Sequence, residues 1–191
     1  MKKIVLSSAS PRRKELLSQL GINFIVDPVN GDEETDTDLE PHQLTRVVAI
    51  KKALAVAGRH PNTIIIAADT IGVLDGKILG KPHTSVAARK MLTEMSGKAH
   101  RVITGYAVLD TATANSISNS VETIVYIKLL SSAEIDRYVK TGEPLDKAGA
   151  YGIQDRGAII VERIEGDYFN VVGLPLFALA KTLKEFGINI L

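Results

Sequence analysis

The chain has 191 residues, 45% of them hydrophobic and 24% charged, so it can bury a sizeable core in one domain or two small lobes. Its 23 basic and 22 acidic side chains give a net charge of +1, which provides no overall field for binding long nucleic acids or an anionic membrane. The absence of cysteine excludes disulfides, thiolate metal sites and a cysteine nucleophile. No apolar run approaches the roughly 20 residues of a membrane span or forms a signal-peptide core, so we expect a cytoplasmic protein.

Apolar periodicity and helix stop signals predict an α/β chain. The expected elements are, in chain order, a strand at 2–6, a helix at 11–20, a strand at 24–26, a helix at 41–58, a strand at 63–68, a hairpin at 73–79 turning at Asp75-Gly76, a helix at 84–95, strands at 101–110 and 121–129 joined by a connection at 111–120, a helix at 133–140 capped by Ser132, a glycine-punctuated loop at 142–154, a strand at 158–164, a turn at 166–170 and a helix at 175–186. We expect one domain over residues 1–191, with a mixed, partly antiparallel sheet flanked by helices and a central cleft between two lobes.

The first candidate site lies where the first expected strand turns into the first helix. Ser10 is a good N-cap, so Arg12 and Arg13 fall in the first helical turn. The helix dipole favours negative charge at that end, so two arginines there make most sense if an anion completes the site. Guanidinium groups suit phosphate oxygens, and a small residue such as Ser8 lets the backbone come close. A solvated basic helix end is an equally open interpretation.

An acidic segment follows the second expected strand, with six carboxylates in residues 32–40. An EF-hand is a poor match, because Thr37 stands where that loop needs glycine and Gln43 where it needs glutamate. A charge run of this kind is usually a solvated loop. One or two of its members can still reach a metal if the loop faces the arginines.

Further candidates follow along the chain. The helix after the acidic segment carries Lys51 and Lys52 on its more polar side, where either can simply face solvent. The next strand is continuously apolar, therefore expected to be central, and it ends in Asp69-Thr70. A carboxylate where a buried strand meets a loop is where α/β folds place catalytic and ligand groups, although a capping or turn aspartate is equally open. Lys81, after the hairpin, is another candidate cation.

Several common enzyme classes are excluded by their missing motifs. There is no G-x-x-x-x-G-K-[ST] and no G-x-G-x-x-G, and the four histidines are too scattered for the H-E-x-x-H of a zinc hydrolase. Hydroxyls, arginines, lysines and carboxylates remain. This combination is typical of phosphate chemistry, in which cations neutralise a polyphosphate and carboxylates hold a divalent metal or orient water.

Six short motifs also occur in a distinctive order and spacing. They are Ser8-Ala9-Ser10-Pro11-Arg12-Arg13, Ala67-Ala68-Asp69-Thr70, Gly80-Lys81-Pro82, Met95-Ser96-Gly97-Lys98 through Thr104-Gly105, Gly142-Glu143-Pro144 through Gln154, and Gly166-Asp167-Tyr168 through Pro175. Together they resemble the Maf family of nucleoside triphosphate pyrophosphatases over nearly the full length. The resemblance implies a fold related to the inosine triphosphate pyrophosphatases, hydrolysis of a nucleotide to monophosphate and pyrophosphate, and a homodimer.

The resemblance also implies roles for individual residues. Asp69 is the expected proton acceptor for the attacking water, although the same carboxylate suits a metal ligand equally well. Glu33 is expected to help hold that metal, Mg²⁺ or Mn²⁺. The residues expected to hold phosphates are Ser8, Arg12, Arg13, Lys52 and Lys81.

The resemblance also implies which nucleotide bases the protein prefers. Ala68-Asp69-Thr70 is similar to the subgroup acting on dTTP and UTP, and Arg12, Thr70 and Gln154 match the positions linked to that preference. A threonine hydroxyl and a glutamine amide can pair with a pyrimidine edge and leave a purine unpaired and crowded. Asp155 stands where the family commonly has glycine, and its side chain can shift the loop that carries Gln154.

A non-enzymatic alternative stays open, because the family is also associated with septum formation. In that interpretation the chain is a nucleotide-binding regulator of cell division with little or no catalysis. The presence of Asp69 and the acidic segment beside a full set of cations favours the enzyme, since a pure binder needs no carboxylate that activates water. A nucleic-acid partner is disfavoured, because the basic residues form a pocket-sized cluster without interleaved aromatic residues.

Overall fold

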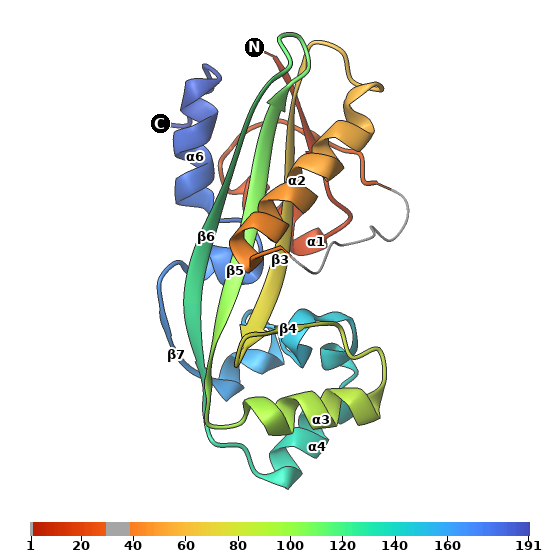
Figure 1. The fold of residues 1–191 in the computed structure, drawn as a ribbon, viewed down its shortest axis with the longest axis vertical. Helices are drawn as coiled ribbons and strands as arrows, with labels where there is room; N and C mark the ends of the chain where they lie inside the picture. Colours follow the sequence, from red (N-terminus) through yellow and green to blue (C-terminus); the bar gives the residue numbers. More distant parts are fainter. Residues whose placement is uncertain (1, 30–38) are drawn as a thin grey trace. The chain divides into compact units, whose positions relative to one another are not determined.

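The computed structural model describes residues 2–29 and 39–191 (Figure 1). The elements in these stretches are β1 (Lys3–Ser7), α1 (Pro11–Ser18), β2 (Ile25–Val26), α2 (Pro41–Ala57), β3 (Thr63–Leu74), β4 (Lys77–Leu79), α3 (Ser85–Met95), β5 (Ala99–Asp110), β6 (Asn115–Ile127), α4 (Ser132–Lys140), the 3₁₀ helices η1 (Glu143–Asp146), η2 (Ala148–Ala150) and η3 (Arg156–Ile160), β7 (Val161–Glu165), α5 (Tyr168–Val172) and α6 (Leu176–Glu185). Over these two stretches, no helix is both long and apolar enough to cross a membrane.

The strands of the described residues form one seven-stranded sheet in the order β2-β1-β3-β5-β6-β7, with β4 paired to β3. β1 is parallel to both β2 and β3, and the helical crossovers α1 and α2 make this parallel pairing possible. β4 is antiparallel to β3, and β7 is antiparallel to β6. The predicted mixed, partly antiparallel sheet is therefore confirmed.

The chain groups into two compact units. The first unit comprises Met1–Thr70, Thr104–Val121 and Gly173–Leu191, and the second comprises Ile71–Ile103 and Glu122–Val172. Strands β3, β5 and β6 contribute residues to both units. The expectation of one domain with a central cleft stays a prediction.

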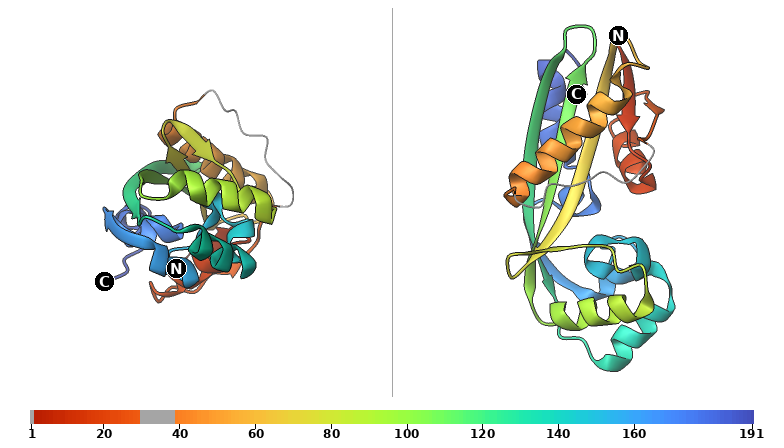
Figure 2. Two further views of the ribbon diagram at one scale, coloured as in Figure 1. Left: turned by 90° about the horizontal axis from the view of Figure 1, so that it is seen from below. Right: turned by 45° about the vertical axis from the view of Figure 1, so that its right-hand side comes forward.

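Two helices cover opposite faces of the sheet in the first unit (Figure 2). Neighbouring residues of a strand point to opposite faces, and in β5 Gly105 lies against α2 whereas Tyr106 reaches α6. A Cβ at Gly105 would lie 2.3 Å from the carbonyl carbon of Thr45, so α2 rests directly on the strand backbone. The Tyr106 hydroxyl lies 3.0 Å from Thr182 Oγ1 of α6. Buried apolar residues fill the space beside α2, namely Val5, Ala53, Val56, Ile65, Ala67 and Leu109.

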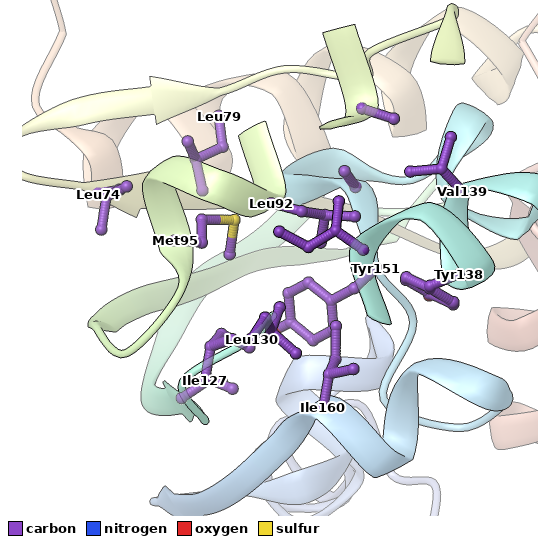
Figure 3. Packing of buried hydrophobic residues seen from close by; sticks show 14 of the residues in the cluster. Leu74, Leu79, Leu92, Met95, Ile127, Leu130, Tyr138, Val139, Tyr151 and Ile160 are labelled. Carbon is purple, nitrogen blue, oxygen red and sulfur yellow. The ribbon is translucent and has the colours of Figure 1, made fainter. Parts of the chain in front are cut away.

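The second unit has its own hydrophobic core (Figure 3). Side chains from α3 and α4 meet those of the glycine-rich loop and of the strand ends. Tyr151 lies in the middle of this packing, near Leu92 and Leu130 in the view of Figure 3. The other labelled members are Leu74, Leu79, Met95, Ile127, Tyr138, Val139 and Ile160. The loop at 142–154 is therefore anchored in a core at Tyr151.

Several predicted boundaries are wrong. β6 begins at Asn115 rather than 121, because the polar residues expected to form a connection continue the strand. Ser131 rather than Ser132 caps α4, where it forms a capping box with Glu134. The strand expected at 158–164 is the helix η3 followed by β7. The predicted hairpin turn is confirmed, since Asp75 and Gly76 both have positive φ, at 49° and 78°.

Candidate anion site and nucleotide specificity loop

The turn from β1 into α1 is built around two serines. Ser10 is the N-cap, and its Oγ accepts a hydrogen bond from Arg13 N at 3.4 Å. Ser8 is buried, and its Oγ accepts from the Ser10 N–H at 3.2 Å and from an Arg13 Nη at 3.4 Å. These two donors fill the two lone pairs of the Ser8 hydroxyl. Its hydrogen is therefore left to donate to another group.

The Arg13 guanidinium is held by groups far apart in the sequence of the first unit. Its Nε donates to Gly173 O at 2.8 Å, and one Nη donates to Thr70 Oγ1 at 2.9 Å. Burial lowers the pKa of Arg13 from its usual value, the nearby Asp69 opposes that effect, and Arg12 adds to it. An arginine stays charged under these influences, so Arg13 is a fixed cation beside Ser8.

Arg12 differs from Arg13 although it is the neighbouring residue. Its side chain is half-buried, and no residue in 2–29 or 39–191 forms a hydrogen bond or ion pair with it. The two guanidinium groups of this helical turn therefore differ in role. Arg13 binds groups of the protein, whereas the five N–H donors of Arg12 are left for other groups.

Thr70 connects the guanidinium to β5. Its Oγ1 accepts from Arg13 and lies 2.9 Å from Thr104 Oγ1, where either hydroxyl can be the donor. Thr104 is fully buried. The hydroxyl of Thr70 thus already has two protein partners.

Lys52 and Asp69 form an ion pair in the same unit. Lys52 Nζ lies 2.7 Å from Asp69 Oδ1, and the two side chains are 22% and 21% exposed. Ser7, fully buried at the end of β1, donates to Lys52 O at 3.0 Å and so ties this turn of α2 to the sheet. Of the two lysines that the pattern left open, Lys52 contacts the carboxylate and Lys51 is exposed.

Asp69 lies inside a strand, which corrects one expectation. β3 runs on through Asp69 to Leu74, because residues beyond 70 pair with β4. The carboxylate is therefore fixed by strand geometry rather than carried on a loop. Within the described residues, Lys52 is the one side chain that donates to the Asp69 carboxylate, and it binds Oδ1, which leaves Oδ2 for water or a cation.

Lys81 belongs to the second unit and is exposed. The residues on either side of it are hydrogen-bonded to the glycine-rich loop. Gly80 O accepts from Gly149 N at 3.2 Å, and His83 N donates to Leu145 O at 3.0 Å. Two backbone hydrogen bonds thus fix the segment that carries this cation.

Gln154 also belongs to the second unit. It is exposed next to Asp155, on the segment between η2 and η3. The side chain that departs from the family pattern is thus at the surface. Whether Asp155 shifts the loop stays a prediction.

Of the two carboxylates expected to hold a metal, Asp69 lies within the residues that the structure describes. Glu33 lies outside the described residues, so its role stays a prediction. Within 2–29 and 39–191, no three His, Cys, Asp or Glu side chains gather closely enough to hold a metal. Asp69 Oδ2 suits a divalent cation, but the remaining ligands would have to come from phosphate oxygens, water or the acidic segment.

Two groups of the site were not predicted as site residues. Thr104 and the carbonyl of Gly173 fix Thr70 and Arg13, from 34 and 160 residues away in the chain. Both lie in segments that carry the Maf resemblance. No local spacing signals a contact of this kind, because the sheet and the α5–α6 connection create it.

The first unit thus belongs to an α/β protein in which Arg13 contacts Ser8 and Thr70, and Lys52 pairs with Asp69. The chain belongs to the Maf family, whose model, described as Maf-like protein, matches residues 3–186.

Similar proteins include the dTTP/UTP pyrophosphatases of Methanosarcina mazei and Methanococcoides burtonii. The first is 48% identical over 191 residues, covering 100% of this chain and 97% of the relative. The second is 51% identical over 191 residues, covering 100% and 98%. Among solved structures, a HAM1 protein from Coxiella burnetii superposes with a TM-score of 0.56 at 16% identity, covering 97% of this chain and 100% of that one. This likeness shows the fold, and the predicted fold class and family are confirmed.

Proposed function

We propose that the protein hydrolyses nucleoside triphosphates, preferentially dTTP and UTP, to nucleoside monophosphate and pyrophosphate. The observation that carries the proposal is the Lys52–Asp69 pair in the same unit as the Ser8–Arg13 turn. The names of the full-length relatives support the substrate class, because several of them at 46–51% identity are dTTP/UTP pyrophosphatases.

In this proposal the cations hold the polyphosphate. Ser8 donates its remaining hydroxyl hydrogen to a phosphate oxygen, and Arg12 supplies a guanidinium fork. Arg13 adds fixed positive charge while its hydrogen bonds to Gly173 and Thr70 keep the turn in shape. Lys52 and Lys81 are the further phosphate ligands. Positive charge close to the leaving pyrophosphate stabilises the negative charge that develops as the bond breaks.

Asp69 is the proposed proton acceptor. Lys52 donates to Oδ1 and orients the carboxylate, so Oδ2 can orient a water molecule and take its proton as the oxygen attacks the α-phosphorus. The water oxygen forms the new P–O bond, and the bond to the bridging oxygen of pyrophosphate breaks. The carboxylate could also be a metal ligand.

A divalent cation, Mg²⁺ or Mn²⁺, completes the proposal. Glu33 and Asp69 would hold it, and it would polarise the phosphate and offset its charge. The donor chemistry fits, since carboxylate and phosphate oxygens are the ligands these ions prefer.

Base preference is assigned to Arg12, Thr70 and Gln154. The Thr70 hydroxyl is engaged by Arg13 and Thr104, so its effect on the nucleotide is expected to run largely through the position of Arg13. Gln154 is exposed and has an amide that can pair with a pyrimidine edge.

The remaining expectations accompany this function. We propose that residues 1–191 act as a single Maf-like domain in the cytoplasm, as a homodimer, without a nucleic-acid or membrane partner. The near-zero net charge supports the last point.

The test is incubation with a panel of NTPs and dNTPs plus Mg²⁺ or Mn²⁺, with pyrophosphate and orthophosphate resolved among the products. Pyrophosphate and monophosphate from dTTP and UTP are expected. Orthophosphate would mean attack at the terminal phosphate. Nucleotide binding without any product would favour the regulator of cell division instead.

A further inference from the structure

The loop that carries Gln154 is closed at its base. Gly152 and Gly157 lie so close together that a Cβ at Gly157 would be 2.4 Å from Gly152 O. A Cβ at Gly152 would be 2.9 Å from Lys147 Cε. Gly157 is buried, whereas Gln154 and its neighbour Asp155 are exposed. The two exposed residues therefore project from a base that has no room for side chains.

One tyrosine and one glutamate, both outside residues 152–157, hold this base. Tyr138 of α4 accepts a hydrogen bond from Gly152 N at 3.2 Å and donates to Glu143 Oε1 at 2.8 Å. Glu143 Oε1 accepts from Gly157 N at 3.1 Å, and its Oε2 accepts from Arg156 N at 3.1 Å. The pair thus satisfies backbone N–H groups on both sides of the loop tip.

The pair is itself fixed in the second unit. Tyr138 is buried, and Lys147, also buried, donates to Glu143 O at 2.9 Å. Burial and the hydrogen bond to Glu143 raise the pKa of Tyr138, so its hydroxyl stays protonated and donates to the carboxylate. A charged acceptor shared by three donors is a strong and rigid connection.

We infer that Tyr138 and Glu143 are positioning residues that set the base preference by holding the Gln154 loop. The inference rests on the proposed function, in which Gln154 reads the base. An amide discriminates between bases only if its orientation is fixed, because a mobile amide can pair with several of them. Neither side chain needs to touch the nucleotide for this effect.

The first test is Tyr138→Phe, which removes one oxygen and keeps the ring in the core. We expect KM for dTTP and UTP to rise about 5- to 10-fold with kcat changed less than about 2-fold, as for one lost buried hydrogen bond. The preference for UTP over GTP in kcat/KM should fall by about 10-fold. Glu143→Gln should act in the same direction. Tyr126→Phe is the matched control, because it removes a tyrosine–glutamate hydrogen bond to Glu165 away from the loop, and it should change none of these values.

A double-mutant cycle tests the route of the effect. If Tyr138 acts through Gln154, Tyr138→Phe should not change the base preference further in a Gln154→Ala background. An unchanged preference in folded Tyr138→Phe and Glu143→Gln would overturn the inference. So would an equal fall in kcat for every nucleotide.

The wild-type protein gives a test that depends neither on variants nor on turnover. The amide hydrogens of Gly152, Arg156 and Gly157 should be protected from exchange in the absence of nucleotide, because they already donate to Tyr138 and Glu143. Fast exchange at these amides would contradict the hydrogen bonds of Tyr138 and Glu143 to the loop. Protected amides in a protein that releases no pyrophosphate would instead count against the proposed function, while the hydrogen bonds to the loop would be confirmed.

Discussion

Asp69 gains its proposed role from its surroundings, since it lies inside a strand with one oxygen bound to Lys52. Asp69→Asn keeps an oxygen for Lys52 but cannot take a proton from water. We expect turnover of dTTP to fall by at least about 100-fold while nucleotide affinity changes only a few-fold. Single-turnover kinetics and calorimetric binding measure the two effects. Asp75→Asn, at the β3–β4 turn, is the control, and retained turnover in Asp69→Asn would remove Asp69 from the mechanism.

The two neighbouring arginines should respond differently to the same change. A lysine at position 13 cannot reproduce the hydrogen bonds to Gly173, Thr70 and Ser8, so Arg13→Lys should lose about 1–3 kcal/mol of unfolding free energy and much of the turnover. Arg12→Lys should weaken nucleotide binding and leave stability within about 0.5 kcal/mol. Urea denaturation with parallel kinetics distinguishes them. Equal stability of both variants would show that the guanidinium contacts of Arg13 do not hold the turn.

For individual residues, the sequence predicted which residue types form the candidate site better than it predicted which residues contact one another. The N-cap Ser10 was predicted and confirmed because capping is local. Lys52 could not be separated from Lys51 by periodicity, because both fall on the polar side of α2. The choice depends on the fold, which brings Asp69 to Lys52 from a different element.

Among the elements, α2 rests directly on the backbone of β5 at Gly105. Gly105→Ala would place a methyl group against the backbone of Thr45, which cannot move without displacing the helix. We expect a loss of about 3 kcal/mol of unfolding free energy and a displaced Lys52 with reduced turnover. Gly58→Ala, at the end of the same helix with open space around its Cβ, should be nearly neutral. Equal urea midpoints for the two variants would contradict this packing.

Element types were predicted more successfully than element ends. The long strands were expected from their apolar runs, but β6 starts six residues earlier than position 121, in a polar stretch where strand pairing outweighs local propensity. The loop at 142–154 was recognised from its glycines. Its two short 3₁₀ helices, η1 and η2, and the Tyr138–Glu143 pair depend on contacts that no local pattern encodes.

At the scale of the whole molecule, the buried His100 predicts a pH dependence of stability. Burial lowers its pKa from the usual 6.5 to about 4, and the nearby backbone of Val125 opposes part of the shift. Its ring Nε2 lies 2.9 Å from the Tyr151 hydroxyl in the core of the second unit. The unfolded chain therefore binds a proton before the folded one does, so this contribution is complete above pH 6.5 and is lost as the pH falls toward 4.

The expected loss is about 3 kcal/mol of unfolding free energy between pH 6.5 and pH 4. Urea denaturation across this range should show a shallower decline for His100→Gln than for the wild type. His83→Asn, at an exposed position, should follow the wild type. Identical slopes for wild type and His100→Gln would contradict the assignment. Carboxylates with lowered pKa values, such as Asp27 at about 2, keep their stabilising contribution until the pH falls below their usual value, which for Asp27 is 3.8.

The proposed reaction is attack of water on the α-phosphorus of dTTP or UTP. Hydrolysis in ¹⁸O-labelled water with Mg²⁺, followed by mass spectrometry of the products, locates the attacked phosphorus directly. We expect one ¹⁸O atom in dTMP or UMP and none in pyrophosphate. Label in pyrophosphate, or in orthophosphate released from the terminal position, would contradict it.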